Sequence, residues 1–113
     1  MELENEQALK LTIIYGENDQ FNHHPLYVEI VKRAHSFGIA GATVVRGIES
    51  YGRTNHIHST RILSLSSDLP IVITLVDLED KITEFYKSIS DLLGGGIAFI
   101  EEVTVLHYKQ SKG

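Results

Sequence analysis

Residues 70–96 read PIVITLVDLEDKITEFYKSISDLLGGG, and this stretch combines one strand with one helix. Pro70 opens an apolar run over residues 71–76, which is apolar on both faces, as in a central strand covered on both sides. Asp77 is placed to cap a helix, whose first turn carries acidic residues where the helix dipole favours negative charge. The apolar residues that follow have helical spacing: Ile82, Phe85, Tyr86, Ile89, Leu92 and Leu93.

The first half of the chain shows the same order of elements. Apolar and polar residues alternate over 9–15, which predicts a strand with one buried face. A polar connection over 17–24 leads to Pro25, which suits the first position of a helix. We expect this helix to end before Gly38, in the left-handed position that glycine favours, and a strand to run from Gly41 to about Tyr51.

A last strand over 97–108 completes the order β-α-β-β-α-β, which is typical of the ferredoxin-like α+β sandwich. We expect a four-stranded antiparallel sheet in the spatial order 4-1-3-2, with both helices on one face. The 113 residues suit a single domain over 1–113, with an ordered core of about 9–108. We expect the face of the sheet without helices to be an oligomer interface. The apolar residues that are candidates for this face are Ile14, Val44, Ile48, Ile71 and Ile73.

Charge and composition narrow the class of protein. The formal net charge is −5, which argues against DNA or RNA as a partner, because duplex-binding proteins present a basic face. The chain contains no cysteine, which excludes disulfides and thiolate metal sites and fits the cytoplasm. Its first ten residues are polar and acidic, unlike a signal peptide, and no apolar run reaches the ~18–20 residues of a membrane span.

One connection is much longer than the fold requires. Residues 52–69 join the second and third predicted strands, where a hairpin needs only about two to five residues. Basic residues gather here in an otherwise acidic chain, and guanidinium groups bind carboxylate or phosphate oxygens. We interpret the segment as an anion or nucleotide site; the alternative is that its arginines are solvated or pair with a neighbouring subunit. The candidate ligand-binding residues are Arg46, Gly52, Arg53, His56, His58 and Arg61.

Two smaller patterns have alternative interpretations. His56 and His58 lie two residues apart, so on an extended segment both imidazoles face one way, but a metal would need a third ligand. They also suit a surface pair that donates to an anion. Gly94, Gly95 and Gly96 follow a helix rather than precede one, so they form no phosphate loop of the usual kind. They are expected to cap the helix and turn the chain, or to let a ligand or subunit approach the backbone.

The common catalytic motifs are absent from the sequence. There is no G-x-S-x-G, no H-E-x-x-H, no cysteine nucleophile and no P-loop. Glu101 and Glu102 are adjacent on a strand, so they point to opposite faces and do not form a catalytic pair. We therefore expect a protein that is not an enzyme and has no cofactor.

Three motifs together resemble a known family. They are GATVVRGIESYG at 41–52, His56-x-His58, and LSSDLPIVI at 65–73. They resemble the uncharacterised family called domain of unknown function one-ninety, which is similar to the PII nitrogen-regulatory proteins and to the CutA proteins. The resemblance covers residues 11–108 and implies a ferredoxin-like subunit that forms homotrimers.

The resemblance also implies where a ligand would bind. In PII proteins nucleotides bind in clefts between subunits, at the base of the long loop and at the glycine turn before the fourth strand. The matching segments here are residues 52–61 and 94–96. PII proteins carry a basic residue after that turn and arginines after the fourth strand. This chain has Ile97 and Ala98 after the turn, and Glu101, Glu102 and Leu106 farther on.

These departures disfavour an ATP triphosphate and leave open a smaller anion, a monophosphate nucleotide or no nucleotide. The leading hypothesis is a PII-like regulatory protein that binds such a ligand between subunits and signals through the 52–69 loop. The alternatives are a structural or adaptor trimer, docked on a partner protein or transporter without a small ligand, and a CutA-like divalent-metal binder.

Overall fold

The computed structural model describes residues 2–50, 58–59 and 69–111. Two helices and one short 3-10 helix alternate with strands along the chain. The elements are β1 (Glu2–Gly16), β2 (Gln20–Phe21), β3 (His24–Pro25), α1 (Leu26–Phe37), β4 (Gly41–Arg46), β5 (Glu49–Ser50), β6 (His58–Ser59), β7 (Pro70–Asp77), α2 (Glu79–Ser88), η1 (Ser90–Leu92) and β8 (Ile97–Lys109).

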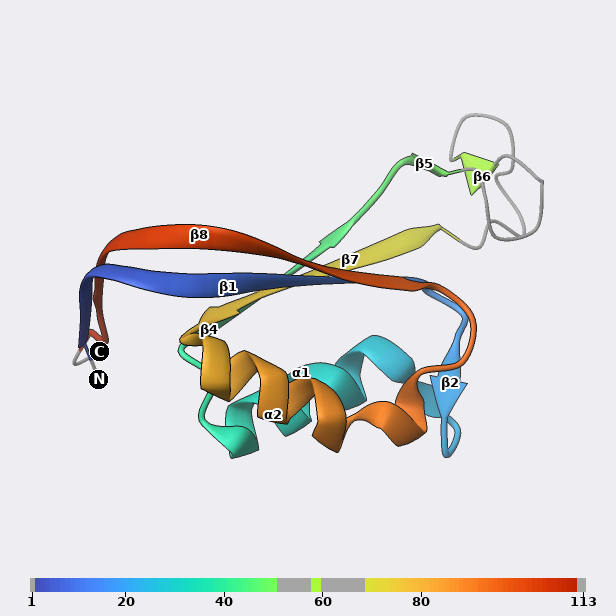
Figure 1. The fold of residues 1–113 in the computed structure, drawn as a ribbon. Coiled ribbons are helices and arrows are strands. Elements are labelled where there is room, and N and C mark those ends of the chain that lie inside the picture. Colours follow the sequence, from blue (N-terminus) through green and yellow to red (C-terminus); the bar gives the residue numbers. More distant parts are fainter. Residues whose placement is uncertain (1, 51–57, 60–68, 112–113) are drawn as a thin grey trace.

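Four long strands form one antiparallel sheet in the order β4-β7-β1-β8. Counted along the chain as first to fourth, they have the predicted spatial order 4-1-3-2, so the fold class and topology are confirmed. Both helices lie on the same side of the sheet (Figure 1), as predicted. The central strand β7 is the apolar segment that opens at Pro70.

The hydrophobic core lies between the sheet and the two helices. Alternate residues of β1 and β7 point into it, because side chains in a strand alternate between faces. Ile13, Ile73 and Leu75 are completely buried there, as are Ile30 of α1 and Phe85 of α2. The ring of Phe85 meets that of Phe37 edge to face, with 5.6 Å between their centroids. The core therefore confirms most of the predicted stripe of the second helix, since Ile82, Phe85, Ile89 and Leu92 are buried, whereas Tyr86 is 40% exposed.

The assignment of residues to the helix-free face was partly wrong. Ile71 and Ile73 are buried in the core and Val44 packs against it, so these three face the helices. Their neighbours along the strands, Val45 and Val72, occupy the helix-free face instead. The error arose because β4 and β7 are apolar at successive positions, so period-2 alternation does not distinguish their faces.

Helix ends differ by a few residues from the predicted ones. Pro25 is the residue before α1 rather than its first, and Gly38 ends that helix with φ 91° as expected. Asp77 is not the cap of α2, which is Leu78. The buried Asp77 carboxylate instead accepts hydrogen bonds from the backbone N–H of Ala40 at 2.8 Å and of Leu78 at 2.6 Å. It thereby joins the start of β4 to the end of β7.

Other boundaries differ because the connections contain local structure. The predicted strand from Gly41 to Tyr51 ends at Arg46, and β5 then forms a separate two-stranded pair with β6. The connection between β4 and β7 therefore covers residues 47–69. The polar connection at 17–24 contains the β2–β3 hairpin, whose turn at Asn22 and His23 has positive φ. Helix α2 ends at Ser88 and the short 3-10 helix η1 follows it. The three glycines therefore come after η1 and not directly after α2.

The sheet also extends beyond the predicted core of 9–108. Residues 2–7 of β1 pair with 104–109 of β8, forming a terminal ribbon outside the four-stranded part. Figure 1 shows this ribbon curving at its end, where both termini lie. Tyr108 donates its hydroxyl to the carbonyl of Ala40 at 2.9 Å, and Leu3 is buried there. A groove of about 220 Å³ lies between the ribbon and the start of β4, lined by Leu3, Ala40, Gly41, Thr43, Thr74, Val76, Val105, His107 and Tyr108.

No helix in the described part of the chain is long and apolar enough to cross a membrane.

Candidate functional site

The candidate site lies at the end of the sheet where the 47–69 connection leaves and returns. Here Arg46 of β4, Ile71 of β7 and Tyr15 of β1 lie in one row across the strands. The side chain of Arg46 is 58% exposed, and its Nε lies 3.5 Å from the Oε2 of Glu17. An exposed ion pair of this length contributes little to stability. Arg46 therefore keeps donors available to an anion.

Backbone contacts close the base of the connection. The N–H of Gly47 donates to the carbonyl of Pro70 at 2.8 Å, and that of Glu17 donates to the carbonyl of Leu69 at 2.8 Å. A Cβ on Gly47 would lie 2.6 Å from the Cγ of Pro70, so any larger residue would force this contact to shift. We call Arg46, Gly47, Leu69 and Pro70 the loop base. Backbone hydrogen bonds thus join the two ends of the connection to each other and to the residue after β1.

The turn formed by Gly94, Gly95 and Gly96, the glycine turn, lies at the same end of the sheet. Gly96 has φ +94°, and a Cβ there would lie 2.6 Å from the carbonyl oxygen of Ile14 and 2.7 Å from the ring of Tyr15. A Cβ added at Gly94 would have no atom within 4 Å. The predicted turn is thus confirmed, but the predicted cap is wrong, because the C-caps of α2 and η1 are Ile89 and Leu93. The glycines also differ from one another: Gly96 packs against β1, whereas Gly94 is open.

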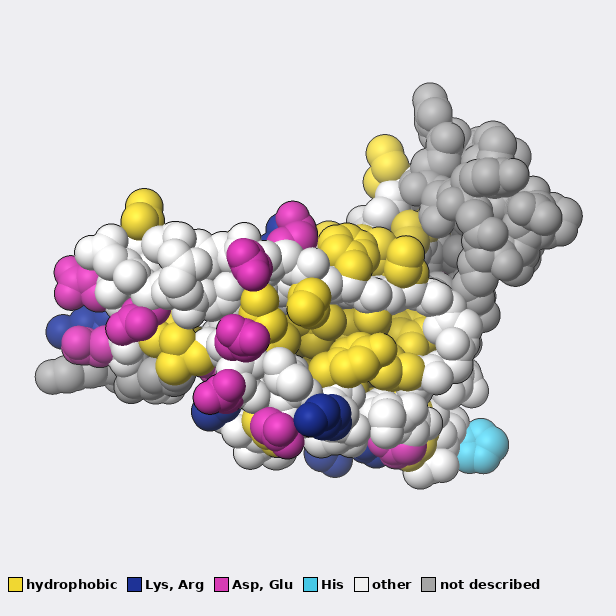
Figure 2. All heavy atoms as spheres, in the orientation of Figure 1, with side chains coloured by type: hydrophobic (Ala, Val, Ile, Leu, Met, Phe, Trp, Pro, Cys, Tyr) yellow, Lys and Arg dark blue, Asp and Glu magenta, His cyan; other side chains and the backbone are white. Residues whose placement is uncertain are grey.

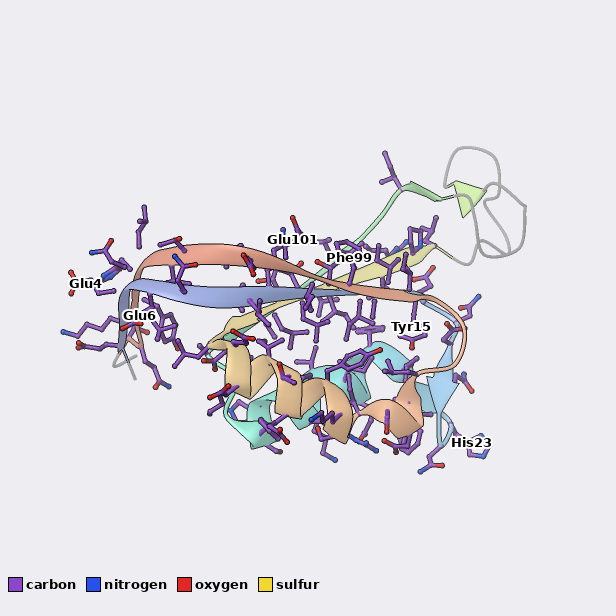
Figure 3. The ribbon with its side chains drawn as sticks, in the orientation of Figure 1. Glu4, Glu6, Tyr15, His23, Phe99 and Glu101 are labelled. Atoms are coloured by element: carbon purple, nitrogen blue, oxygen red, sulfur yellow. The ribbon has the colours of Figure 1, made fainter. Side chains whose placement is uncertain are left out.

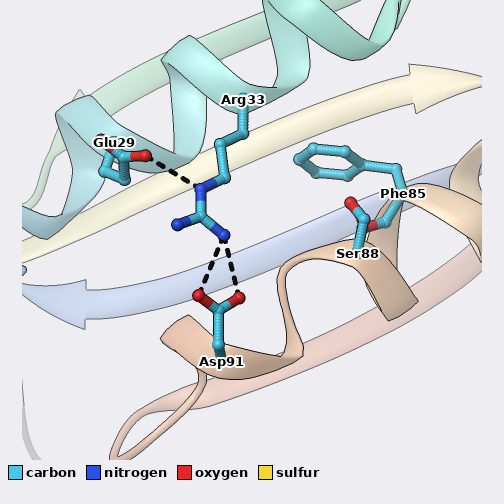
Figure 4. A network of polar contacts seen from close by, with 5 residues as sticks. All are labelled: Glu29, Arg33, Phe85, Ser88 and Asp91. Atoms are coloured by element: carbon cyan, nitrogen blue, oxygen red, sulfur yellow. Dashed lines mark hydrogen bonds and ion pairs between the residues drawn. The ribbon is translucent and has the colours of Figure 1, made fainter.

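A polar network holds the segment just before the glycine turn (Figure 4). Arg33 of α1 donates to both carboxylate oxygens of Asp91 in η1, at 2.9 and 3.1 Å, and to Glu29 at 2.9 Å. Donation to Asp91, and then to Glu29, raises the pKa of the Arg33 guanidinium. The hydrogen bond from Arg33 lowers the pKa of Asp91. The guanidinium also lies 5.2 Å from the centre of the Phe21 ring, so it connects α1, η1 and the β2–β3 hairpin.

Several predicted site residues lie outside the described part of the chain. They are Gly52, Arg53, His56 and Arg61, so their proposed roles stay predictions. His58 lies in β6, paired with Ser50 of β5.

The structure does not bring the two halves of the predicted site together within one chain. The loop base belongs to β4 at one edge of the sheet, and the glycine turn leads into β8 at the other edge. Strands β7 and β1 lie between them, and neighbouring strands are roughly 4.8 Å apart, so the two edges are about 14 Å from each other. Within one chain the loop base and the glycine turn are therefore separated by the width of two strands.

The sequence analysis missed Glu17, the partner of Arg46. Its position directly after the last residue of β1 was the available signal, because β4 also finishes at that end of the sheet. In the described residues, no group of three or more His, Asp or Glu side chains is arranged to hold a metal ion. His23 points away from the body of the protein at the tip of its hairpin (Figure 3).

Comparison with known sequences identifies the family. The family DUF190, described as "Uncharacterized ACR", matches residues 8–105. A UPF0166 protein of Aquifex aeolicus is 36% identical over 97 residues, which cover 86% of this chain and 91% of that protein. The chain belongs to the DUF190 family, also called UPF0166. Another UPF0166 protein, from Methanocaldococcus jannaschii, is 32% identical over 100 residues and covers 88% of this chain and 92% of that protein.

Solved structures similar to this DUF190 protein are PII-like. One is CPII, a PII-like protein from Thiomonas intermedia, in a structure bound to ADP, AMP and bicarbonate. Its TM-score is 0.62 at 16% identity, and the match covers 89% of this chain and 90% of that chain. Another is a putative PII-like signaling protein from Thermus thermophilus, with a TM-score of 0.63 at 16% identity, covering 93% of this chain and 92% of that chain. At this identity the comparison establishes a PII-like fold.

Proposed function

We propose that this DUF190 protein is a PII-like regulatory protein that binds a small anionic ligand, such as a nucleoside monophosphate or bicarbonate, between subunits. The 52–69 segment then carries the signal to a partner protein. The proposal describes a binding protein and not an enzyme, and its expected location is the cytoplasm.

The observation that carries the proposal is the exposed guanidinium of Arg46 at a hydrogen-bonded loop base. Its ion pair with Glu17 has an N–O distance of 3.5 Å and lies at the surface, so an anion can replace or share it. The sequence adds Arg53 and Arg61 in the adjoining connection. The PII-like fold supports the choice of ligand, because CPII of Thiomonas intermedia binds ADP, AMP and bicarbonate.

The proposal includes a homotrimer assembled through the helix-free face. Apolar side chains on this face remain exposed in the single chain, among them Val45, Ile97 and Phe99. Figure 3 shows Phe99 pointing away from the helices. A contiguous apolar face of this kind is unusual on a monomer and is typical of an interface.

A thermal-shift panel tests the ligand class. The panel contains AMP, ADP, ATP, bicarbonate, phosphate and divalent metal ions, each added to the wild-type protein. A ligand at one hundred times its dissociation constant should stabilise the protein by about 2.7 kcal/mol. We expect AMP or bicarbonate to give the largest increase in melting temperature. A flat panel would contradict the proposal and favour the adaptor trimer, and a response to metal ions alone would favour the CutA-like alternative.

The pH dependence separates an anion site from a metal site. Protonated imidazoles at His56 and His58 would add positive charge, so anion binding should tighten as the pH falls through about 6.5. Metal binding should weaken over the same range, because protons compete for the imidazole nitrogens. Titrations at pH 6 and pH 8 distinguish the two.

A further inference from the structure

The connection between β1 and α1 contacts both halves of the candidate site. At its first residue, Glu17, the N–H donates to the carbonyl of Leu69 at 2.8 Å, and the Oε2 lies 3.5 Å from the Nε of Arg46. At Phe21 the same connection meets the guanidinium of Arg33, which lies 5.2 Å from the centre of the ring. The connection therefore joins the loop base to the side chain that holds the segment before the glycine turn.

This connection is short and is closed by its own hydrogen bonds. The N–H of Asp19 donates to the carbonyl of Gly16 at 3.1 Å, and the N–H of Leu26 donates to the carbonyl of Asp19 at 2.8 Å. Between these two turns β2 and β3 pair as a hairpin. Networks of hydrogen bonds of this kind carry energetic coupling between separate segments. A displacement at Phe21 should therefore reach Glu17.

The glycine turn has one anchor at each end. At its far end Gly96 packs on the carbonyl of Ile14, where a Cβ would lie 2.6 Å from the oxygen. Before the turn, η1 has only three residues, and helices of this type have poorer hydrogen-bond geometry than α-helices. The two hydrogen bonds from Arg33 to Asp91, at 2.9 and 3.1 Å, tie η1 to α1. Without them the start of the turn would be held by the backbone of η1 and the buried side chain of Leu92.

Arg33 differs from an ordinary charged residue of the surface. Figure 2 shows basic and acidic side chains over the helices, and ion pairs at such exposed positions contribute little. Lys87 and Glu84, for example, are 3.7 Å apart and 69% and 65% exposed. The side chain of Arg33 is only 28% exposed, donates in two directions and lies over an aromatic ring. Its planar, forked guanidinium is held in one orientation by these contacts.

We propose that Arg33 is a positioning residue that couples the glycine turn to the loop base through residues 17–25. Its contact with Asp91 sets the start of the turn, and its contact with Phe21 sets the connection that reaches the loop base. Loss of the Arg33 side chain should therefore loosen both ends of the candidate site. The effect on a ligand rests on the proposed function, whereas the coupling between the two segments does not require a ligand.

Hydrogen exchange of single amides, followed by NMR, tests the coupling without a ligand. The reporters are the N–H of Leu93, at the end of η1, and the N–H of Glu17, at the loop base. Arg33→Ala should speed exchange at both by about 3- to 10-fold, as for other residues that lie along a coupling network. The N–H of Ile82, in the first half of α2, is the internal control and should change less.

Two further variants locate the path of the coupling. Phe21→Leu keeps an apolar side chain but removes the ring under the guanidinium. It should therefore speed exchange at Glu17 and leave exchange at Leu93 unchanged. Lys87→Ala removes an exposed ion pair of α2 and should change neither reporter.

Two results of the exchange experiment would overturn the coupling. One is unchanged exchange at Glu17 in Arg33→Ala. The other is equal acceleration at Glu17, Leu93 and Ile82, because an equal change at all three amides is an ordinary loss of stability.

Titration with AMP separates the coupling from the proposed function. Arg33→Ala should bind AMP about 3- to 10-fold more weakly than wild type, and Lys87→Ala should bind it equally well. Faster exchange at Glu17 and Leu93, without AMP binding to wild type, would retain the coupling and contradict the ligand. Equal AMP affinity in wild type and Arg33→Ala, with unchanged exchange at Glu17, would retain the ligand and overturn the coupling.

Discussion

The two faces of the sheet differ in how completely the chain covers them. On the helix side, Ile13, Ile73 and Leu75 have no exposed surface. On the other side of the same sheet, Val45 and Ile97 are more than half exposed. The chain therefore builds one closed core and leaves one apolar face open. The closed face explains the stability of the subunit, and the open face and edges are where we place assembly and ligand binding.

The largest expected effect comes from breaking the closed face. Phe85→Ala removes a fully buried ring that packs on Phe37, and the cavity should lower the free energy of unfolding by about 3–5 kcal/mol. Tyr86→Ala is the matched control, since Tyr86 is the next residue of α2 and is exposed. Chemical denaturation measures both. A loss below about 1 kcal/mol for Phe85→Ala would contradict the described core.

A smaller effect is expected at the glycine turn. Gly96→Ala would put a Cβ against the Ile14 carbonyl and the Tyr15 ring at a positive φ, and should destabilise the protein by about 1–3 kcal/mol. Gly94→Ala should change stability by less than about 1 kcal/mol, because its Cβ would enter open space. Thermal or denaturant unfolding measures the stability of both variants. Equal losses of stability would contradict the described conformation of the turn.

The Arg33–Asp91 contact should contribute a still smaller, pH-dependent effect. Because the hydrogen bond from Arg33 lowers the pKa of Asp91, the contact stabilises the fold above the unfolded-state pKa. This contribution is lost as the pH falls through the lowered folded-state pKa. Asp91→Asn should therefore be less stable than wild type at pH 7 and close to it at pH 2. A difference in stability between Asp91→Asn and wild type that stays unchanged at low pH would show that the ion pair is not its cause.

The least effect on the fold, but a clear one on assembly, is expected on the open face. Ile97→Lys alters an exposed side chain, so the free energy of unfolding of the subunit should change by no more than about 0.5 kcal/mol. Light scattering should report about three times 12.7 kDa for wild type and a lower mass for this variant. Leu106→Lys, at another exposed position of β8, is the control and should keep the wild-type mass. A monomeric wild type would remove the proposed interface.

The sequence predicted the fold well because its strongest signals agree with the final packing. Helical spacing around Ile82 and Phe85, and alternation over residues 9–15, each identify a single buried stripe. The faces of β4 and β7 were harder, since valine and isoleucine occupy successive positions and both faces are apolar. Ile71 and Val44 were therefore assigned to the wrong side.

The candidate site was predicted only in part, for a physical reason. Local patterns proposed Arg46 and the three glycines as candidates, but Glu17 reaches Arg46 across the intervening strand β7, which no local pattern reports. Asp77 shows the same limit. Its type and position suit a helix cap, yet its carboxylate also binds the backbone of Ala40, which is distant in sequence. Contacts between distant segments depend on the sheet order, which has to be known first.

Isothermal titration of AMP into wild type, Arg46→Ala and Glu17→Ala tests the anion site most directly. A charge-assisted hydrogen bond contributes about 1.5–3 kcal/mol, so Arg46→Ala should lower the affinity roughly 10- to 100-fold. Glu17→Ala removes the carboxylate that competes for Arg46, so its affinity should equal or exceed that of wild type. Equal affinity in wild type and Arg46→Ala, or no binding to wild type, would contradict the assignment of the loop base as an anion site.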